Sequence, residues 1–351
     1  MTMQSLLQTY KRFRTLQSSR ISTMPIVILM PHSACNCRCV MCDIWKGNKH
    51  ITQLNKDDIK DLLISLKKLG TKQVVISGGE ALLHPDFFDF CRLLQQEQLK
   101  ITLLSTGITL RKHADALLES VNEIIVSIDG DQTGHDKIRN ITGAFANLEV
   151  GVKYIKLKNP KFPIRSRTVI HRLNFRIWKD IIHSAREIGL DQVSFLPADI
   201  SSQAFNRQVP WDEKRQEDIQ LSKEELPELK QVIETLFTEH RKAFDNHFIA
   251  ESREKIMGIY SYYAALQGED NFPHKRCNAP WVSAVIEPDG SIRPCFFHPA
   301  IGNIHANRLE DIINSNTAIK FRKSLNVGCD PTCVKCVCSL YLSPAINPAD
   351  I

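Results

Sequence analysis

The sequence predicts an α/β protein, in which a partial (β/α)6 TIM-like barrel is followed by a small C-terminal α+β domain. Three observations carry this prediction: short β-branched runs alternate with amphipathic segments, this rhythm stops after Pro197, and the cysteines fall into two separate groups. Alternating strands and helices are typical of a parallel sheet with helices packed on its face. Six strand–helix units are too few for a closed eight-stranded barrel, so we expect an open one.

Runs rich in Val, Ile, Leu or Phe predict six strands, over residues 26–30, 73–76, 101–104, 123–128, 165–171 and 192–196. Amphipathic segments between them predict helices over residues 56–69, 85–96, 110–120, 144–157 and 175–188. Apolar residues at helical spacing then predict two further helices, over 221–240 and 244–266. The turn sequence at 288–290 predicts a hairpin between 282–287 and 292–297.

These changes of pattern divide the chain into four parts. We expect an N-terminal helical extension over residues 1–20, the partial barrel over 21–220, a helical connector over 221–270 and a C-terminal cluster-binding domain over 271–351. A chain of 351 residues with 43% hydrophobic content is long enough and apolar enough for this arrangement.

The charge pattern argues against nucleic acid or a membrane as a partner. The net charge of +6 comes from Lys and Arg scattered along the chain, with no basic block and no nucleic-acid-binding motif. Lys11, Arg12 and Arg14 interrupt the apolar residues of the N-terminus, which excludes a signal peptide or membrane span there. We therefore expect a cytoplasmic protein.

The cysteines are expected to bind metal, because a reducing compartment disfavours disulfides. Cys91 stands alone, and the other ten form an early group and a late group. The early group is Cys35, Cys37, Cys39 and Cys42, and the late group is Cys277, Cys295, Cys329, Cys333, Cys336 and Cys338. Such clustering predicts two metal sites.

Cys35, Cys39 and Cys42 follow the first predicted strand, in the loop where barrel enzymes place their chemistry. Three thiolates on a four-iron cluster would leave one iron open to a ligand that is not protein. A zinc site, or thiols without metal, remains an alternative on spacing alone. Cys37 does not fit the ligand spacing, and we expect it not to be a ligand.

Two further elements lie at the ends of predicted strands. Gly78 and Gly79 end the second strand and allow close backbone approach to a ligand, and Glu80 adds a carboxylate there. In the fourth strand, alternation places Ser127 and Asp129 on one face, which we expect to point into the barrel.

The Cys-x3-Cys-x2-Cys spacing in the first loop of a β/α chain resembles the signature of the radical S-adenosylmethionine (SAM) superfamily. The resemblance implies a 4Fe-4S cluster on Cys35, Cys39 and Cys42 whose open iron binds SAM, and whose reduction splits SAM into methionine and a 5′-deoxyadenosyl radical. It also implies SAM contacts from the residues Gly78, Gly79, Glu80, Ser127, Asp129 and Arg139. The chain has Met41 where the family usually has an aromatic residue.

The late cysteines resemble the SPASM and twitch domains that bind auxiliary clusters in this superfamily, and they match the shorter twitch form best because the full SPASM pattern is not completed. The matching elements are a cysteine, then Gly-x4-Cys across the hairpin, then Cys-x2-Cys, which gives Cys277, Cys295, Cys333 and Cys336. Four thiolates would close an auxiliary 4Fe-4S cluster to substrate. Cys329 and Cys338 are possible replacements for one of the four, and a structural zinc ribbon is the alternative on spacing.

The resemblance implies hydrogen abstraction from a bound substrate, with electrons supplied by a reducing partner such as flavodoxin or ferredoxin. The segment before the first strand is too short for a leader-peptide recognition domain, which favours a small molecule over a peptide. Arg167 and His171 share a face of the fifth strand and are candidates for substrate contact or for a structural role. A peptide-modifying maturase is one alternative, and a non-catalytic iron-sulfur electron carrier or redox sensor is another.

Overall fold

The computed structural model describes residues 3–207 and 209–344. Its centre is one curved nine-stranded sheet with the strand order β6-β5-β4-β3-β2-β1-β7-β8-β9. The strands are β1 Ile26–Leu29, β2 Gln73–Ile76, β3 Lys100–Ser105, β4 Glu123–Ser127, β5 Ile164–Ile170, β6 Gln192–Pro197, β7 Ser283–Ile286, β8 Ser291–Arg293 and β9 Gly302–Asn303. The partial barrel of parallel strands is therefore confirmed, and each predicted strand of the barrel matches to within one residue at either end.

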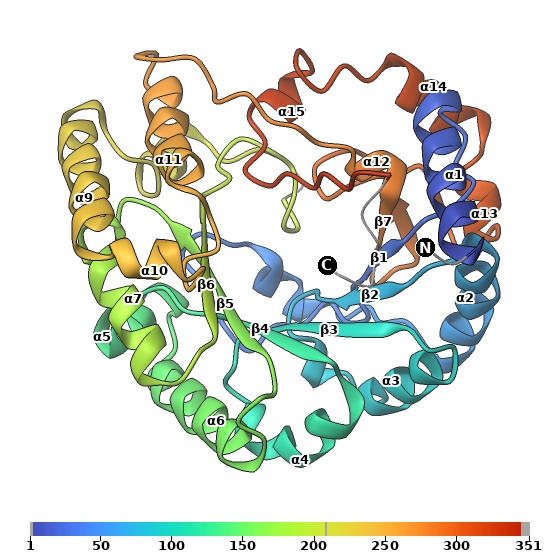
Figure 1. The fold of residues 1–351 in the computed structure, drawn as a ribbon, viewed down its shortest axis with the longest axis horizontal. Coiled ribbons are helices and arrows are strands. Elements are labelled where there is room, and N and C mark those ends of the chain that lie inside the picture. Colours follow the sequence, from blue (N-terminus) through green and yellow to red (C-terminus); the bar gives the residue numbers. More distant parts are fainter. Residues whose placement is uncertain (1–2, 208, 345–351) are drawn as a thin grey trace.

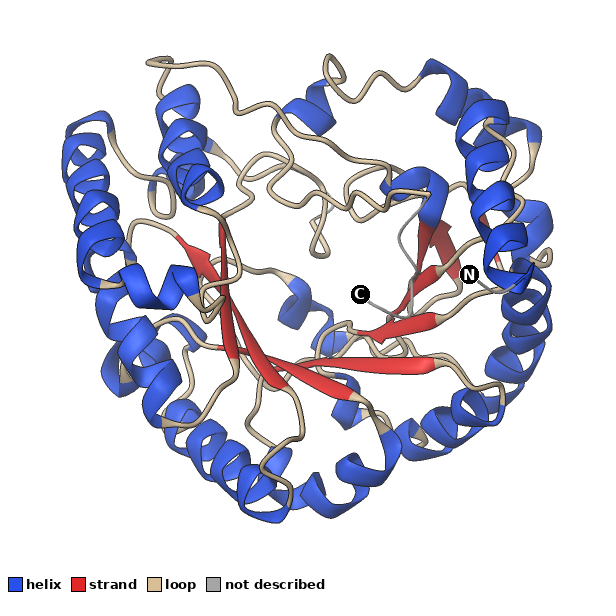
Figure 2. Cartoon of the chain, in the orientation of Figure 1, coloured by secondary structure: helices blue, strands red, loops and turns tan. Residues whose placement is uncertain are grey.

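The helices of the first part of the chain are α1 Met3–Ser18, η1 Ile44–Lys49, α2 Lys56–Leu69, η2 Ala81–Leu83, α3 Phe87–Gln96, α4 Leu110–Ser120, α5 Gln132–Arg139, α6 Ala144–Lys158, η3 Phe175–Ile177 and α7 Trp178–Glu187. Of these, α2, α3, α4, α6 and α7 lie on the outer, convex side of the sheet (Figures 1 and 2). The later helices are α8 Glu213–Glu217, η4 Lys223–Glu225, α9 Leu226–Glu239, α10 Arg241–Asp245, α11 Arg253–Leu266, α12 Ala279–Val282, α13 Leu309–Ile312, α14 Asn316–Ser324 and α15 Pro331–Val334. Among the described residues no helix is long and apolar enough to cross a bilayer.

Alternation along the strands separates an outer core from an inner cavity. Val74, Ile101 and Ile124 face outward and belong to the main core, where they pack with residues of the surrounding helices. Val75 and Ile125, one residue further along, instead line a cavity inside the barrel. The period of two thus gives each strand one face for folding and one face for a ligand.

The prediction of one helix over 244–266 is wrong in its first half. α10 ends at Asp245 and α11 begins only at Arg253, with His247 between them in the left-handed region at φ 58°. The intervening segment forms a bridge with β6, because Val193 donates to Phe248 O over 2.7 Å. This segment covers the exposed edge of β6 and so pairs backbone groups of that strand. The spacing of apolar residues in the sequence does not reveal this need, and it therefore predicted one continuous helix.

The predicted C-terminal hairpin is present, and it extends the barrel sheet. β7 pairs in parallel with β1, and β8 pairs antiparallel with β7. β8 ends at Arg293, shorter than predicted, because Pro294 has no N–H to continue the ladder. The late cysteines are thereby attached to the same sheet as the early ones.

Close packing of α4 on α6 can be tested at Gly151. A β-carbon there would lie 2.6 Å from Leu110 Cβ, whereas at Gly258 in α11 the nearest atom would be 3.9 Å away. We expect Gly151→Ala to lower the free energy of unfolding by about 1–3 kcal/mol, through overpacking. Gly258→Ala should raise it by up to about 1 kcal/mol, through helix propensity. Urea unfolding followed by circular dichroism measures both, and equal effects would contradict the packing.

Candidate active site

The early cysteines lie on a loop between β1 and η1 that hydrogen bonds anchor at several points. Arg38 and Val40 donate their backbone N–H groups to the last turn of α5, over 3.0 Å each. Asn48 holds Cys35 from both sides, since its Oδ1 accepts from the Cys35 N–H at 2.9 Å and its Nδ2 donates to the Cys35 carbonyl at 2.8 Å. The loop conformation is therefore fixed by the chain itself.

The glycine turn after β2 presses directly on this loop. Gly78 has φ +124°, and a β-carbon on Gly79 would lie 2.1 Å from the Ala34 carbonyl oxygen. Gly79 donates to His32 O and Glu80 donates to Ala34 O, over 3.3 and 2.8 Å. The glycines are needed here for close approach of two chain segments, a reason the sequence analysis did not foresee.

Glu80 is fully buried, and its carboxylate is held by the last residue of β3 and by the residue that follows it. Thr106 donates to it from its N–H at 2.7 Å and from its hydroxyl at 2.8 Å, and Ser105 Oγ lies 3.1 Å from both carboxylate oxygens. Burial raises the pKa of Glu80, and these hydrogen bonds oppose the rise. Beside it, the buried Asn36 Nδ2 has no hydrogen-bond partner within the described chain. An unpaired buried donor of this kind suits a polar ligand group.

Asp129 and Arg139 form a buried ion pair at the end of β4. The Arg139 guanidinium lies 2.5 Å from Asp129 Oδ2, and its other terminal nitrogen lies 3.5 Å from Cys39 Sγ. Arg139 therefore connects two of the predicted elements, the cysteine loop and the fourth strand. It is the last residue of helix α5 and is buried.

The thiols of the early group differ in their surroundings. Burial raises the pKa of both Cys35 and Cys42 to about 12, so the metal-free chain carries neutral thiols there at pH 7. A hydrogen bond from Cys37 lowers the pKa of Cys39 to about 7. Cys37 is itself buried, and its hydrogen bond to Cys39 gives it a role in the loop that needs no metal.

Sequence reasoning missed the loop that follows β6 and covers the cysteines. Trp211 donates from Nε1 to Asp43 Oδ2 at 2.7 Å and packs in one apolar cluster with Met41. Arg207 stacks on the Trp211 ring at 3.8 Å and forms a buried ion pair with Asp199 at 2.8 Å. No local motif marks these residues, because they come together only when the loop folds back on the barrel.

Five of the six late cysteines line the cavity inside the barrel, which has a volume of about 370 Å³. They are Cys277, Cys295, Cys333, Cys336 and Cys338. Cys329 is exposed and does not line it. None of the cysteines forms a disulfide, all lying in the described ranges. Free thiols gathered on one cavity fit iron-sulfur ligation, and of the two alternative ligands only Cys338 joins them.

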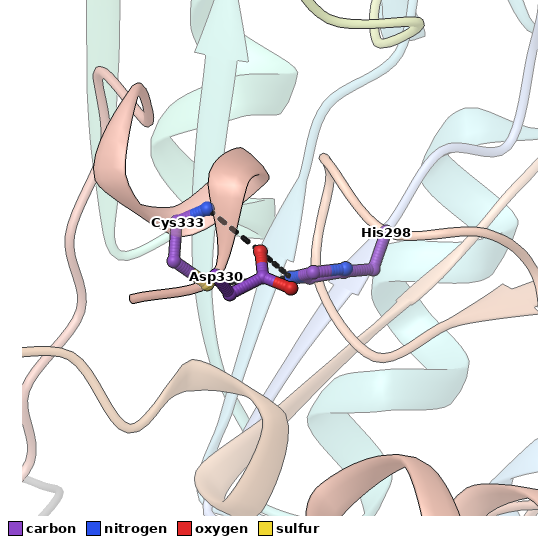
Figure 3. Close-up of side chains that lie close together, drawn as sticks. All are labelled: His298, Asp330 and Cys333. Atoms are coloured by element: carbon purple, nitrogen blue, oxygen red, sulfur yellow. Dashed lines mark hydrogen bonds and ion pairs between the residues drawn. The ribbon is translucent and has the colours of Figure 1, made fainter. Parts of the chain in front are cut away.

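His298 joins this thiol group and was not singled out from the sequence. Its Nε2 lies 3.4 Å from Cys333 Sγ and 3.9 Å from Asp330 Oδ1 (Figure 3). Burial lowers the pKa of His298, so the ring is neutral at pH 7 and offers a single N–H. Lys275, also missed, donates from Nζ to the carbonyls of Val334 and Cys336 and so holds the turn between the thiols.

Gly79→Ala should displace the cysteine loop, because the added methyl group would overlap the Ala34 carbonyl. We expect this variant to lose about four irons per chain while it keeps the late cluster. Gly328→Ala is the matched control, since its β-carbon would meet nothing closer than 3.5 Å beside the late group. Iron and sulfide analysis with electron paramagnetic resonance measures the result, and a full iron content in Gly79→Ala would contradict it.

His298→Phe should lower the reduction potential of the late cluster. A hydrogen bond from Nε2 to Cys333 Sγ would stabilise the more negative, reduced state, and the phenyl ring removes it. His305→Phe is the control, because His305 pairs with Asp58 at 3.1 Å, away from the thiols. A redox titration followed by electron paramagnetic resonance measures both, and identical potentials would exclude this role.

Two family models match this chain, one over the region of the early cysteines and one over the region of the late cysteines. The radical SAM superfamily model matches residues 29–197, and an iron-sulfur cluster-binding domain, SPASM, matches residues 277–337. Radical SAM proteins bind a 4Fe-4S cluster and SAM in the barrel, and SPASM domains bind auxiliary iron-sulfur clusters.

Relatives agree with these matches. The subtilosin biosynthesis protein AlbA of Bacillus subtilis is 24% identical over 318 residues, which is 87% of this chain and 62% of AlbA. An AdoMet-dependent heme synthase of Methanosarcina barkeri is 27% identical over 161 residues, 45% of this chain and 46% of the synthase. The chain thus spans less than two thirds of the length of either relative.

Solved structures share the fold. Streptococcus suis SuiB bound to the precursor peptide SuiA gives a TM-score of 0.64 at 16% identity, over 94% of this chain and 74% of SuiB. AnSMEcpe bound to AdoMet and a peptide gives 0.62 at 18% identity, over 85% and 83% of the two chains. The likeness to these structures shows the fold, and the two family matches show that the chain belongs to the radical SAM superfamily and carries a C-terminal SPASM domain.

Proposed function

We propose that this enzyme cleaves SAM reductively and uses the resulting radical to abstract hydrogen from a substrate, with an auxiliary 4Fe-4S cluster in its C-terminal domain. When bound, the first cluster supplies the electron that splits SAM into methionine and a 5′-deoxyadenosyl radical. The observation that carries the proposal is the convergence of three elements at the carboxyl ends of the strands. Arg139 touches both Asp129 and Cys39, and the turn at Gly79 and Glu80 bonds to the same cysteine loop.

The residue roles follow from this arrangement. Cys35, Cys39 and Cys42 would hold the catalytic cluster. The SAM site would be formed by Gly78, Gly79, Glu80, Ser127, Asp129 and Arg139. Auxiliary thiolates would come from Cys277, Cys295, Cys333 and Cys336, with Cys338 on the same cavity. A protein that only carries electrons does not need the buried carboxylate of Glu80 or the buried Asp129–Arg139 ion pair beside its cysteine loop, because burying charged groups costs free energy.

The lining of the barrel cavity favours a small-molecule substrate. Apolar side chains of the strands line much of the part that the auxiliary cluster would leave free, as is typical of small-molecule sites. Peptide modification is the second candidate, favoured by the likeness to AlbA and to SuiB with its bound precursor peptide. Electrons would come from a reducing protein such as flavodoxin or ferredoxin.

The replacement of Cys35, Cys39 and Cys42 by Ala in one variant tests the proposal. Anaerobically reconstituted and reduced wild-type protein should convert SAM to 5′-deoxyadenosine and carry about eight irons per chain, whereas the variant should form no 5′-deoxyadenosine and keep about half the iron. Cys329→Ala, which removes an exposed thiol outside the cavity, should behave as wild type. Chromatography and iron analysis measure both quantities.

Two results would contradict the proposal. Zinc in place of iron, without 5′-deoxyadenosine, would mean that both cysteine groups are structural. Iron at full content without 5′-deoxyadenosine would indicate an electron carrier or redox sensor.

A further inference from the structure

The cavity inside the barrel has two chemically different ends. One is lined by the five late thiols, which the auxiliary cluster would occupy. The other is lined by inward-facing residues of β1 to β5, half of them apolar, such as Ile28, Val75, Leu104 and Ile125, and half of them polar or charged. Among the charged ones is Arg167 of β5, whose side chain is exposed to the cavity.

Arg167 lies beside the proposed SAM site. In the sheet it pairs with Ser127 of β4 on one side and Ser194 of β6 on the other. Ser127 precedes Asp129 by two residues on the same face, so Arg167 is one strand away from the SAM residues, or about 5 Å. Arg167 and Cys338 both line the cavity. The arginine therefore shares one cavity with the late thiols and lies one strand from the proposed SAM residues.

The other cations on the cavity wall already have partners. Arg165 lies 3.6 Å from the Glu123 carboxylate, and Lys275 donates to backbone carbonyls of the cysteine turn. Arg167, by contrast, has no hydrogen bond or ion pair with any residue in ranges 3–207 and 209–344. The carboxylate of Glu251 accepts from the Phe195 N–H at 3.0 Å. The charge of Arg167 acts on this carboxylate without forming an ion pair, and it opposes the rise that burial causes in the pKa of Glu251.

We propose that Arg167 binds a carboxylate of the substrate inside the barrel cavity, and so selects small carboxylic acids with an apolar body. This rests on the proposed function, because it names the substrate class of that site. The planar fork of a guanidinium donates hydrogen bonds to both oxygens of a carboxylate, and an apolar wall strengthens that pairing. A phosphate dianion would call for more than one unpaired cation, and the described wall of the cavity has just this one.

The experiment uses 4-phenylbutyrate as a probe and 4-phenylbutyramide as its neutral counterpart. Anaerobic calorimetry measures their dissociation constants with the reconstituted, unreduced protein in the presence of SAM. We expect wild type to bind the carboxylate at least about tenfold more tightly than the amide, the size of a charge-assisted hydrogen-bond pair. Arg167→Gln should abolish the preference, and Arg167→Lys should keep part of it.

Arg176→Gln is the matched control, because it removes an exposed arginine that pairs with Glu228 outside the cavity. It should keep the full preference. Equal binding of the two probes to wild type, no binding of either, or a preference that survives Arg167→Gln would each overturn the proposal. So would a tenfold weaker binding of SAM to Arg167→Gln, which would place the arginine in the SAM site.

The same preparations, once reduced, are assayed for 5′-deoxyadenosine. Active cleavage of SAM together with no carboxylate preference would overturn the inference alone. Absence of cleavage in wild type would overturn the proposed function instead.

Discussion

Gly79 has no room for a β-carbon, because the Ala34 carbonyl lies 2.1 Å from where that atom would be. Two hydrogen bonds cross this contact, one from Gly79 and one from Glu80. The backbone of the β2 turn thus forms a wall against which the cysteine loop is shaped. On the other side the loop is held by α5, whose last residue, Arg139, also contacts Cys39. The early thiols are oriented by packing before any metal is present, which reduces the cost of ordering them around one.

The barrel could be predicted from the sequence because its signals are local. Each strand is a short β-branched run, and α2 is framed by a capping box at Asn55 and a left-handed Gly70, so its predicted ends are the observed ones. The spacing of the cysteines can likewise be recognised from the sequence alone, because the ligands of each group lie close together along the chain. The features that the sequence did not predict depend on tertiary contacts. The helix is interrupted near His247 because the chain there pairs with the edge of β6, and His298 lies beside Cys333 only once the C-terminal domain has folded. Cys338 and Cys329 could not be separated by spacing, since burial alone distinguishes them.

The loop after β6 links the two cysteine regions. Trp211 bonds to Asp43, next to Cys42, while the ring of Phe205 lies 6.4 Å from that of Phe296, next to Cys295. The buried Asp199–Arg207 pair fixes the loop between these contacts. Removing one partner would leave an unpaired buried charge, so the pair has to stay intact for the loop to keep its shape. The two cysteine regions are therefore connected by side chains as well as by the sheet.

The pairing of β7 with β1 positions the late cysteines relative to the barrel. Because the C-terminal domain continues the barrel sheet, the late thiols face the same interior as the inner residues of β1 to β5. A substrate held in that interior would have the SAM site at the carboxyl ends of the strands on one side and the auxiliary thiols on the other. Arg167 lines that interior, and its backbone pairs in register with Ser127 and Ser194, so its position is set by the sheet. An anchor on a rigid strand holds a reacting atom more precisely than one on a loop, and hydrogen abstraction demands such precision.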